Sequence, residues 1–199
     1  MSVAEIKKIV TLMILIMCLS IMVATIVACN SAESDHSTGF STILGSSNFD
    51  LKSDATSTCA KGTILVFRSE DSTLCVRIVA RIIIDSDDWG GIAFFLPNGC
   101  ILQDVLSTYP ENKTTEEDSI VLWSAVGDDL KYTTTIEIGR SREYIPTGGG
   151  EGTIVIECNI RDDKKVAELV FGIEASAVKD NGVVIMGLIH DELLIVLPD

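Results

Sequence analysis

The sequence predicts an all-β protein, an antiparallel β-sandwich of immunoglobulin-like architecture that follows an N-terminal apolar segment. Three observations support this fold class. Short segments alternate apolar and polar residues, as strands with one buried face do. Turn-forming residues separate these segments at short intervals. Clear helical patterns do not alternate with the strands, which argues against an α/β fold.

Near its N-terminus the chain has two basic residues, which are followed by a long apolar run. Lys7 and Lys8 precede an uncharged stretch from Ile9 to Ala28. This pattern is typical of an export signal, and the run is also long enough to cross about 30 Å of hydrocarbon as a helix. Basic flanks stay in the cytoplasm, so the rest of the chain is expected on the other side of the membrane. We therefore predict that residues 1–28 form a signal peptide or a membrane anchor helix.

The end of the apolar run resembles a known processing site. Ile26, Val27, Ala28 and Cys29 are similar to the lipobox of prokaryotic lipoproteins, although leucine is commonest where Ile26 stands. The resemblance implies that signal peptidase cuts before Cys29 and that a lipid is attached to its sulfur. The protein would then be lipid-anchored in the cell membrane and would face away from the cytoplasm. An uncleaved anchor and plain secretion are the alternatives.

The next segment, residues 29–60, is rich in serine and threonine and poor in patterned apolar residues. Such a composition buries too little apolar surface to offset the entropy of ordering the chain. We predict a flexible tether here. Phe40, Ile43, Leu44 and Phe49 leave room for a short part of it to dock on the domain.

The sandwich domain is predicted to cover residues 61–199. Its clearest strand is 74–84, where every second residue from Leu74 is apolar and Arg77 and Arg81 lie on the opposite face. Other strands are expected at 63–68, 92–96, 101–106, 120–125, 132–138, 153–160, 183–189 and 193–197, with a glycine-rich loop at 147–152.

A tight turn is predicted in the first half of the domain. Pro97, Asn98 and Gly99 connect the strands at 92–96 and 101–106. Asn-Gly pairs favour the turns of two-residue hairpins. We therefore expect these two strands to pair with each other.

The segment 166–178 fits both a helix and a strand by its periodicity. Gly172 in its middle disfavours a helix. Asn181 and Gly182 then supply a hairpin turn into the strand at 183–189. We predict a strand, with the helix as the alternative.

The charge of the chain excludes one class of partner. It has 29 acidic and 15 basic residues, a net charge of −14 at pH 7. An acidic surface repels phosphate backbones, so nucleic-acid binding is not expected. It also repels anionic lipid headgroups, which favours a lipid or helix as the membrane attachment.

Apart from Cys29, four cysteines lie in the part of the chain expected outside the cytoplasm, where disulfides persist. They allow three connectivities, and the sequence does not choose among them; buried free thiols are the alternative. Their spacing contains no C-x-x-C, which argues against structural zinc. Cys158 alternates with isoleucines of the strand at 153–160, so it is expected to be buried. The candidate disulfide residues are Cys59, Cys75, Cys100 and Cys158.

The acidic loop 85–90 is the best candidate for a ligand site. Clustered carboxylates on a tight loop supply the hard oxygen ligands that Ca²⁺ requires. Asp85, Asp87 and Gly90 match positions one, three and six of an EF-hand loop, but Leu96 stands where a glutamate is needed. This leaves a generic calcium or ligand loop, with a solvated acidic turn as the alternative. The candidate residues are Asp85, Asp87, Asp88 and Trp89.

The two tryptophans lead to different expectations. Trp89 lies beside polar residues and glycines, so it is expected to be exposed and able to stack on a sugar. Trp123 is in phase with Val121 in a predicted strand, so it is expected in the core. No cofactor is expected, apart from Ca²⁺ in the calcium interpretation.

Signatures of catalysis are not found in the sequence. The chain contains neither G-x-S-x-G nor H-E-x-x-H. His190-Asp191-Glu192 has residues that could bind a metal, and a turn between Ile189 and Leu193 explains the segment equally well. We therefore expect a non-enzymatic binding domain in the cell envelope, for an extracellular protein or glycan that the sequence does not specify. A calcium- or carbohydrate-binding module and an envelope hydrolase are the alternatives.

Overall fold

The computed structural model describes residues 42–110, 120–127, 129–140, 146, 148–161, 167–181 and 183–197. The predicted signal or anchor segment and Cys29 lie outside these residues. The chain divides into two units, Met1–Gly39 and Phe40–Asp199, and the second contains every described residue. Within the described ranges, no helix combines the length and apolarity that a membrane crossing requires.

The described part of the second unit contains ten strands. In chain order they are β1 (Thr42–Lys52), β2 (Cys59–Arg68), β3 (Leu74–Ile84), β4 (Ile92–Pro97), β5 (Cys100–Ser107), β6 (Ile120–Ser124), β7 (Tyr132–Ile138), β8 (Gly150–Ile160), β9 (Glu168–Asp180) and β10 (Val183–Val196).

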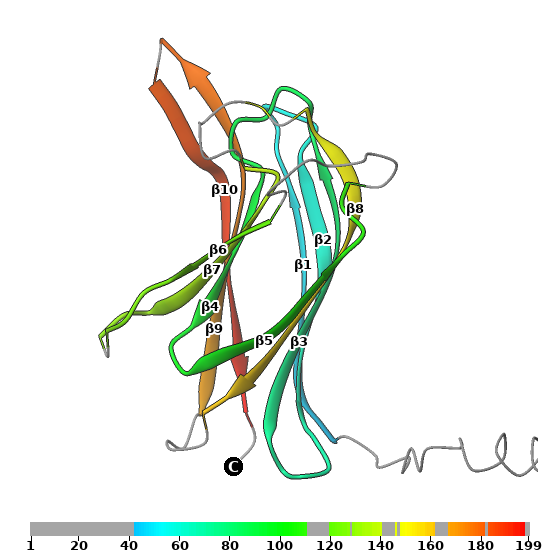
Figure 1. Ribbon diagram of the computed structural model, residues 1–199, viewed down its shortest axis with the longest axis vertical. Coiled ribbons are helices and arrows are strands. Elements are labelled where there is room, and N and C mark those ends of the chain that lie inside the picture. The colour runs from blue at the N-terminus through cyan, green and yellow to red at the C-terminus, as the bar shows by residue number, and fades with distance from the viewer. Residues whose placement is uncertain are drawn as a thin grey trace, which may run out of the picture. The chain divides into compact units, whose positions relative to one another are not determined.

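The strands form two five-stranded sheets that face each other (Figure 1). One sheet has the order β1-β2-β3-β8-β5 and the other has the order β10-β9-β4-β7-β6. All neighbouring strands are antiparallel. The predicted antiparallel β-sandwich is therefore confirmed.

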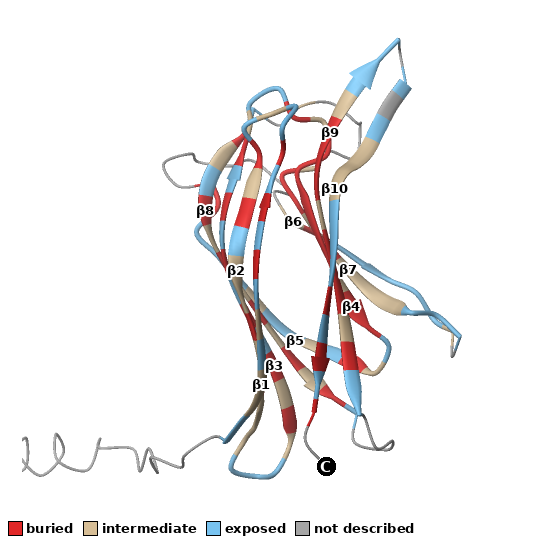
Figure 2. Ribbon diagram, turned by 180° about the vertical axis from the view of Figure 1, so that it is seen from behind, coloured by how far each residue is buried: buried red, intermediate tan, exposed pale blue. Residues whose placement is uncertain are grey.

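The core lies between the two sheets, and most strands bury alternate residues, which are red in Figure 2. β3 has a strict alternation of buried and exposed or half-exposed residues from Leu74 to Ile84, as predicted. Phe49 of β1 packs edge-on against Phe94 of β4, with ring centroids 6.1 Å apart, so aromatic packing joins the sheets. The largest fully buried side chains are those of Phe94, Phe171, Ile64, Ile78, Ile82, Ile92, Leu96, Ile136, Ile138, Ile154, Ile156 and Ile173.

The ambiguous segment 166–178 is confirmed as strand where it is described, in β9. β9 and β10 pair as an antiparallel hairpin through the turn at Asn181, whose φ is +48°. Asparagine tolerates this left-handed conformation better than most residues, which is why the turn signal was reliable.

The prediction of a tether over residues 29–60 is wrong from Thr42 onward. β1 pairs along its length with β2, and its Phe49 and Leu51 are buried. β1 is an edge strand with an outward face in solvent, so that face is polar and the strand resembles a tether in composition.

The predicted hairpin of 92–106 is also wrong. β4 pairs with β7 and β9 in one sheet, whereas β5 pairs with β8 in the other. The turn between them therefore crosses from sheet to sheet. It is held on both sides, since the Asn98 amide donates to the Lys131 carbonyl at 3.1 Å and Arg161 N–H donates to the Gly99 carbonyl at 2.9 Å.

Two shorter segments differ from the prediction as well. The end of the predicted loop at 147–152 is strand, because β8 begins at Gly150. Gly152 lies directly beneath Tyr109, where a Cβ would come within 2.5 Å of the Tyr109 Cα, so a glycine is required for packing. His190, Asp191 and Glu192 form no turn; they lie within β10 and pair with β9.

Candidate functional site

Polar and aromatic side chains gather on the outward face of the sheet β10-β9-β4-β7-β6. Residues directly opposite each other on neighbouring strands point to the same side of a sheet, so the register defines rows across it. Two adjacent rows lie on the side away from the buried isoleucines; together with Lys131, Tyr132 and Arg140 we call them the Trp123 face. The first row is Val121, Glu137, Ala93, Glu174 and His190, and the second is Trp123, Thr135, Phe95, Gly172 and Glu192.

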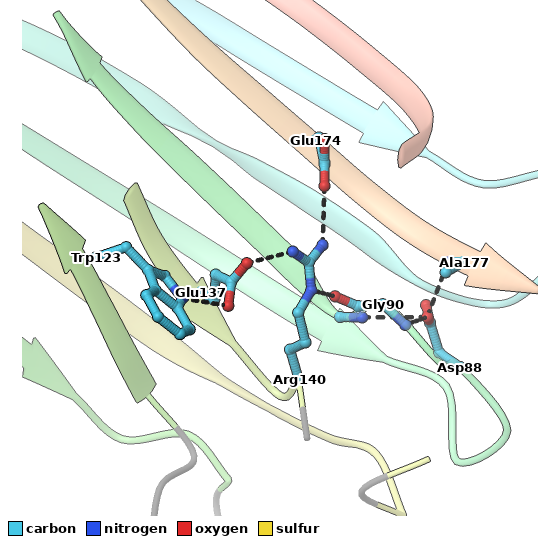
Figure 3. Close-up of polar contacts among 8 residues, drawn as sticks. Asp88, Gly90, Trp123, Glu137, Arg140, Glu174 and Ala177 are labelled. Atoms are coloured by element: carbon cyan, nitrogen blue, oxygen red, sulfur yellow. Dashed lines mark hydrogen bonds and ion pairs between the residues drawn. The ribbon is translucent and has the colours of Figure 1, made fainter. Parts of the chain in front are cut away.

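Arg140 joins two carboxylates of the first row (Figure 3). Its Nη1 pairs with Glu137 and its Nη2 donates to Glu174 Oε1 at 2.8 Å. Its Nε donates to the Gly90 carbonyl at 2.8 Å. The side chain of Arg140 is only 11% exposed, and those of Glu137 and Glu174 are 15% and 20% exposed. The guanidinium therefore ties β7, β9 and the β3–β4 loop into one largely desolvated ion cluster.

Trp123 extends this cluster to the edge of the sheet. Its Nε1 donates to Glu137 Oε2 at 2.7 Å, so the carboxylate held by Arg140 also orients the indole (Figure 3). Yet Trp123 is 53% exposed, and the prediction that it is a core residue is wrong. It does share a face with buried Val121, as the periodicity indicated, but that face is the outward one.

An aromatic cluster is centred on Phe95, in the middle of the second row. Phe95 contacts Tyr132 and His190, with centroid distances of 5.6 Å and 6.4 Å. A Cβ on Gly172 would meet the Tyr132 ring at 3.1 Å, so glycine leaves the room in which this ring lies across the strand. Glu192 accepts from the Tyr132 hydroxyl at 3.0 Å.

Lys131 places a positive charge beside this aromatic cluster. Its Nζ lies 2.6 Å from Glu192 Oε2 and 5.4 Å from the Tyr132 ring centroid. The hydrogen bond raises the pKa of Lys131 and lowers that of Glu192, which keeps both charged. Burial raises the pKa of Tyr132, so its hydroxyl stays a neutral donor.

Asp88 of the acidic loop is buried and has a structural role. Its Oδ1 accepts from the backbone amides of Gly90, Gly91 and Ala177 at 2.7, 3.1 and 3.0 Å (Figure 3). Its Oδ2 accepts from the Thr58 hydroxyl. These bonds fasten the β3–β4 loop to β9 and to the start of β2.

Asp85 and Trp89 of the same loop also have partners within the protein. Asp85 accepts from the amides of Asp87 and Ser57 at 3.0 and 2.9 Å, and these bonds lower its pKa. Among the described residues, no three potential metal ligands come together, so the calcium interpretation gains no support. Trp89 is half-buried, with Lys179 Nζ 4.6 Å from its ring centroid, so it offers less open surface than was expected.

The four cysteines of the domain are free in the structure. Cys59 and Cys75 both face outward, on the neighbouring strands β2 and β3. In the register, however, Cys75 lies opposite Phe67, which is eight residues along β2 from Cys59. The two cysteines are therefore roughly 26 Å apart. Cys100 and Cys158 face inward as diagonal neighbours on β5 and β8, and Cys158 is buried as predicted. Of the candidate pairs, this is the one whose two cysteines share a face and also lie at neighbouring register positions. A bond within the fold would therefore join Cys100 and Cys158.

Alkylation of the folded, reduced domain is expected to divide these cysteines into two classes. Burial raises the pKa of Cys158 to about 12 and also raises that of Cys100, so neither forms much thiolate at pH 8. Cys59 and Cys75 are half-exposed and should react with iodoacetamide first. Peptide mass spectrometry against time checks this. Equal labelling of all four cysteines before unfolding would contradict the inward orientation of Cys100 and Cys158.

No protein-family model and no curated protein matches the chain. The function of the domain must therefore be inferred from its own residues. Among the described residues, we base this inference on the Trp123 face, which brings together aromatic rings and ion pairs.

Proposed function

We propose that this protein is a non-enzymatic binding domain that is anchored outside the cytoplasm and binds its partner through the Trp123 face. The lipobox-like sequence ending at Cys29 supports lipid attachment, and the serine-rich residues after it are suited to a short tether. The partner would be an extracellular protein or glycan.

The architecture we propose for this role is immunoglobulin-like. The order β2-β3-β8-β5 corresponds to the A-B-E-D sheet of such domains, and β4-β9-β10 corresponds to their C-F-G sheet. β1 adds a strand at one edge, and the β6–β7 hairpin adds two strands beyond β4. That hairpin carries Trp123 and Glu137, so the additional strands supply much of the Trp123 face.

The observation that carries the binding role is that the Trp123 side chain is exposed and yet held in place. A large aromatic side chain that is half-exposed and also held by a hydrogen bond to a braced carboxylate offers contact area at a small entropic cost. Tryptophan and tyrosine are over-represented at binding hot spots for this reason. The internal ion pairs of the face position these rings.

Binding is favoured over catalysis because the carboxylates of the face are occupied. A glycosidase needs one carboxyl group that delivers a proton and a second that acts as base or nucleophile. Glu137 and Glu174 lie in one row of the face, with Ala93 between them. Both are joined to the guanidinium of Arg140, so they form one ion cluster and do not present two separate carboxyl groups to a ligand.

The anchoring part of the proposal is tested by fatty-acid labelling of the full chain in a bacterial host. Wild-type protein and the Cys18→Ala control are expected to incorporate labelled fatty acid and to fractionate with membranes. Cys29→Ala is expected to lose the label and to accumulate as a larger, unprocessed precursor. Labelling that is unchanged in Cys29→Ala would remove the lipoprotein assignment.

A further inference from the structure

We infer that the Trp123 face binds a neutral carbohydrate, with the indole of Trp123 stacked on a sugar ring. This inference rests on the proposed binding role and specifies its ligand. Sugars present apolar C–H faces edged by hydroxyl groups. A suitable surface therefore sets aromatic rings beside hydrogen-bonding groups, in a rigid arrangement.

The two rows of the face supply this combination side by side. The second row has Trp123 at one end and Phe95 two strands away, about 10 Å at the usual strand spacing, with half-exposed Thr135 between them. Tyr132 and His190 flank Phe95. The polar groups beside these rings are the half-exposed Thr135 hydroxyl and the side chains of His190 and Glu192, which are 46% and 44% exposed. Glu137 and Glu174 of the first row are held by Arg140 and brace the face from behind.

The charges of the face select an uncharged ligand. Its three glutamates are partly neutralised by Arg140 and Lys131, and the whole chain has a net charge of −14. An anionic polysaccharide would be repelled by this field. A basic peptide would have to compete with two cations that already lie 2.8 Å and 2.6 Å from Glu174 and Glu192. A neutral polyhydroxylated chain meets neither obstacle.

The two tryptophans provide matched reporters for a test. In full-length Trp89→Phe, Trp123 is the one remaining indole, and in Trp123→Phe it is Trp89. Both proteins, in detergent micelles, are titrated with soluble neutral polysaccharides (mannan, β-glucan, galactan and dextran). Acrylamide quenching of the fluorescence is then measured. We expect at least one neutral polymer to lower the quenching of Trp123 about twofold or more while that of Trp89 stays unchanged.

Affinity measured with the protecting polymer gives the second readout. Trp123→Ala is expected to weaken binding at least about tenfold, equivalent to about 1.4 kcal/mol. Val79→Ala, a partly exposed apolar residue on the outward face of the other sheet, should bind as wild type. Equal loss in both variants would overturn the assignment of the face.

The remaining outcomes separate the ligand from the proposed function. Failure of every neutral polymer to protect Trp123 overturns the carbohydrate inference. Protection by hyaluronate or by polylysine instead would also overturn it, although the face would remain a binding surface. If Cys29 labelling and membrane fractionation both fail, the proposed function falls, whatever the quenching shows.

Discussion

Asp88→Ala is expected to lower the melting temperature of the domain by about 10 °C. The substitution removes the acceptor for three backbone amides and for the Thr58 hydroxyl, in a position that water does not reach freely. A hydrogen bond to a charged group contributes about 1.5–3 kcal/mol, and each orphaned buried donor carries a further cost. These contributions do not add fully, so we expect about 4 kcal/mol in total. For a domain of this size, 1 kcal/mol corresponds to roughly 2–4 °C.

Asp87→Ala is the matched control, since Asp87 is an exposed carboxylate in the same loop. Its free energy of unfolding should change by less than about 0.5 kcal/mol. Thermal melts of both variants by circular dichroism, with and without millimolar calcium, make the comparison. Similar melting of the two variants would refute the fastening role of Asp88, and a calcium-dependent rise in wild type would revive the calcium interpretation.

The second large effect is expected for Arg140→Ala, at about 3 kcal/mol of unfolding free energy. The substitution leaves Glu137 and Glu174 largely desolvated and without their common cation. Removing one partner of a buried ion pair costs about 3–5 kcal/mol, and the residual exposure of these side chains places Arg140 at the lower end. It also frees the carboxylate that orients Trp123, so the fluorescence of that indole should shift toward that of a solvated tryptophan.

Arg81→Ala tests whether any ion-paired arginine has this effect. Arg81 pairs with Glu151 at 2.8 Å, but the two side chains are 46% and 50% exposed. Exposed pairs contribute about 0–1 kcal/mol, so the loss should be small.

In Arg140→Ala, a second change of Glu174→Gln should restore part of the stability, because it removes one of the two uncompensated charges. Equal destabilisation by Arg81→Ala and Arg140→Ala would contradict the ion-cluster interpretation; urea denaturation measures both.

Local sequence patterns predicted those elements whose environment is decided locally. β3 and β7 have the predicted bounds, and the β9–β10 hairpin follows from Asn181 and its flanking strands. Each has either a strict alternation or a turn residue that tolerates a positive φ. The alternation reports that one face is buried, whichever strands lie alongside.

Pairing between distant strands could not be obtained in the same way. The turn at Asn98 and Gly99 is tight whether the next strand continues in the same sheet or crosses to the other. β1 has few apolar residues because the face that it turns to solvent is polar, and its pairing with β2 is invisible in composition. Both errors arise because the partner strand, which decides the outcome, is distant in the sequence or poorly patterned.

The Trp123 face was missed because periodicity does not distinguish the inside of a sandwich from a covered part of its outside. Val121 and Trp123 share a phase, and buried Val121 made that phase look internal. The polar alternation of Thr133, Thr135 and Glu137 in the predicted strand was the available signal for an outward face. Arg140 follows that strand, but its contacts to Glu174 and Gly90 depend on tertiary structure.

Protease treatment of spheroplasts that produce the full chain tests the central claim, an anchored domain outside the cytoplasm, most directly. We predict release of a resistant fragment that begins between residues 30 and 41, since β1 begins at Thr42 and its backbone is paired with β2. Mass spectrometry of the supernatant identifies its first residue. A chain that stays intact until the spheroplasts are lysed would contradict the account.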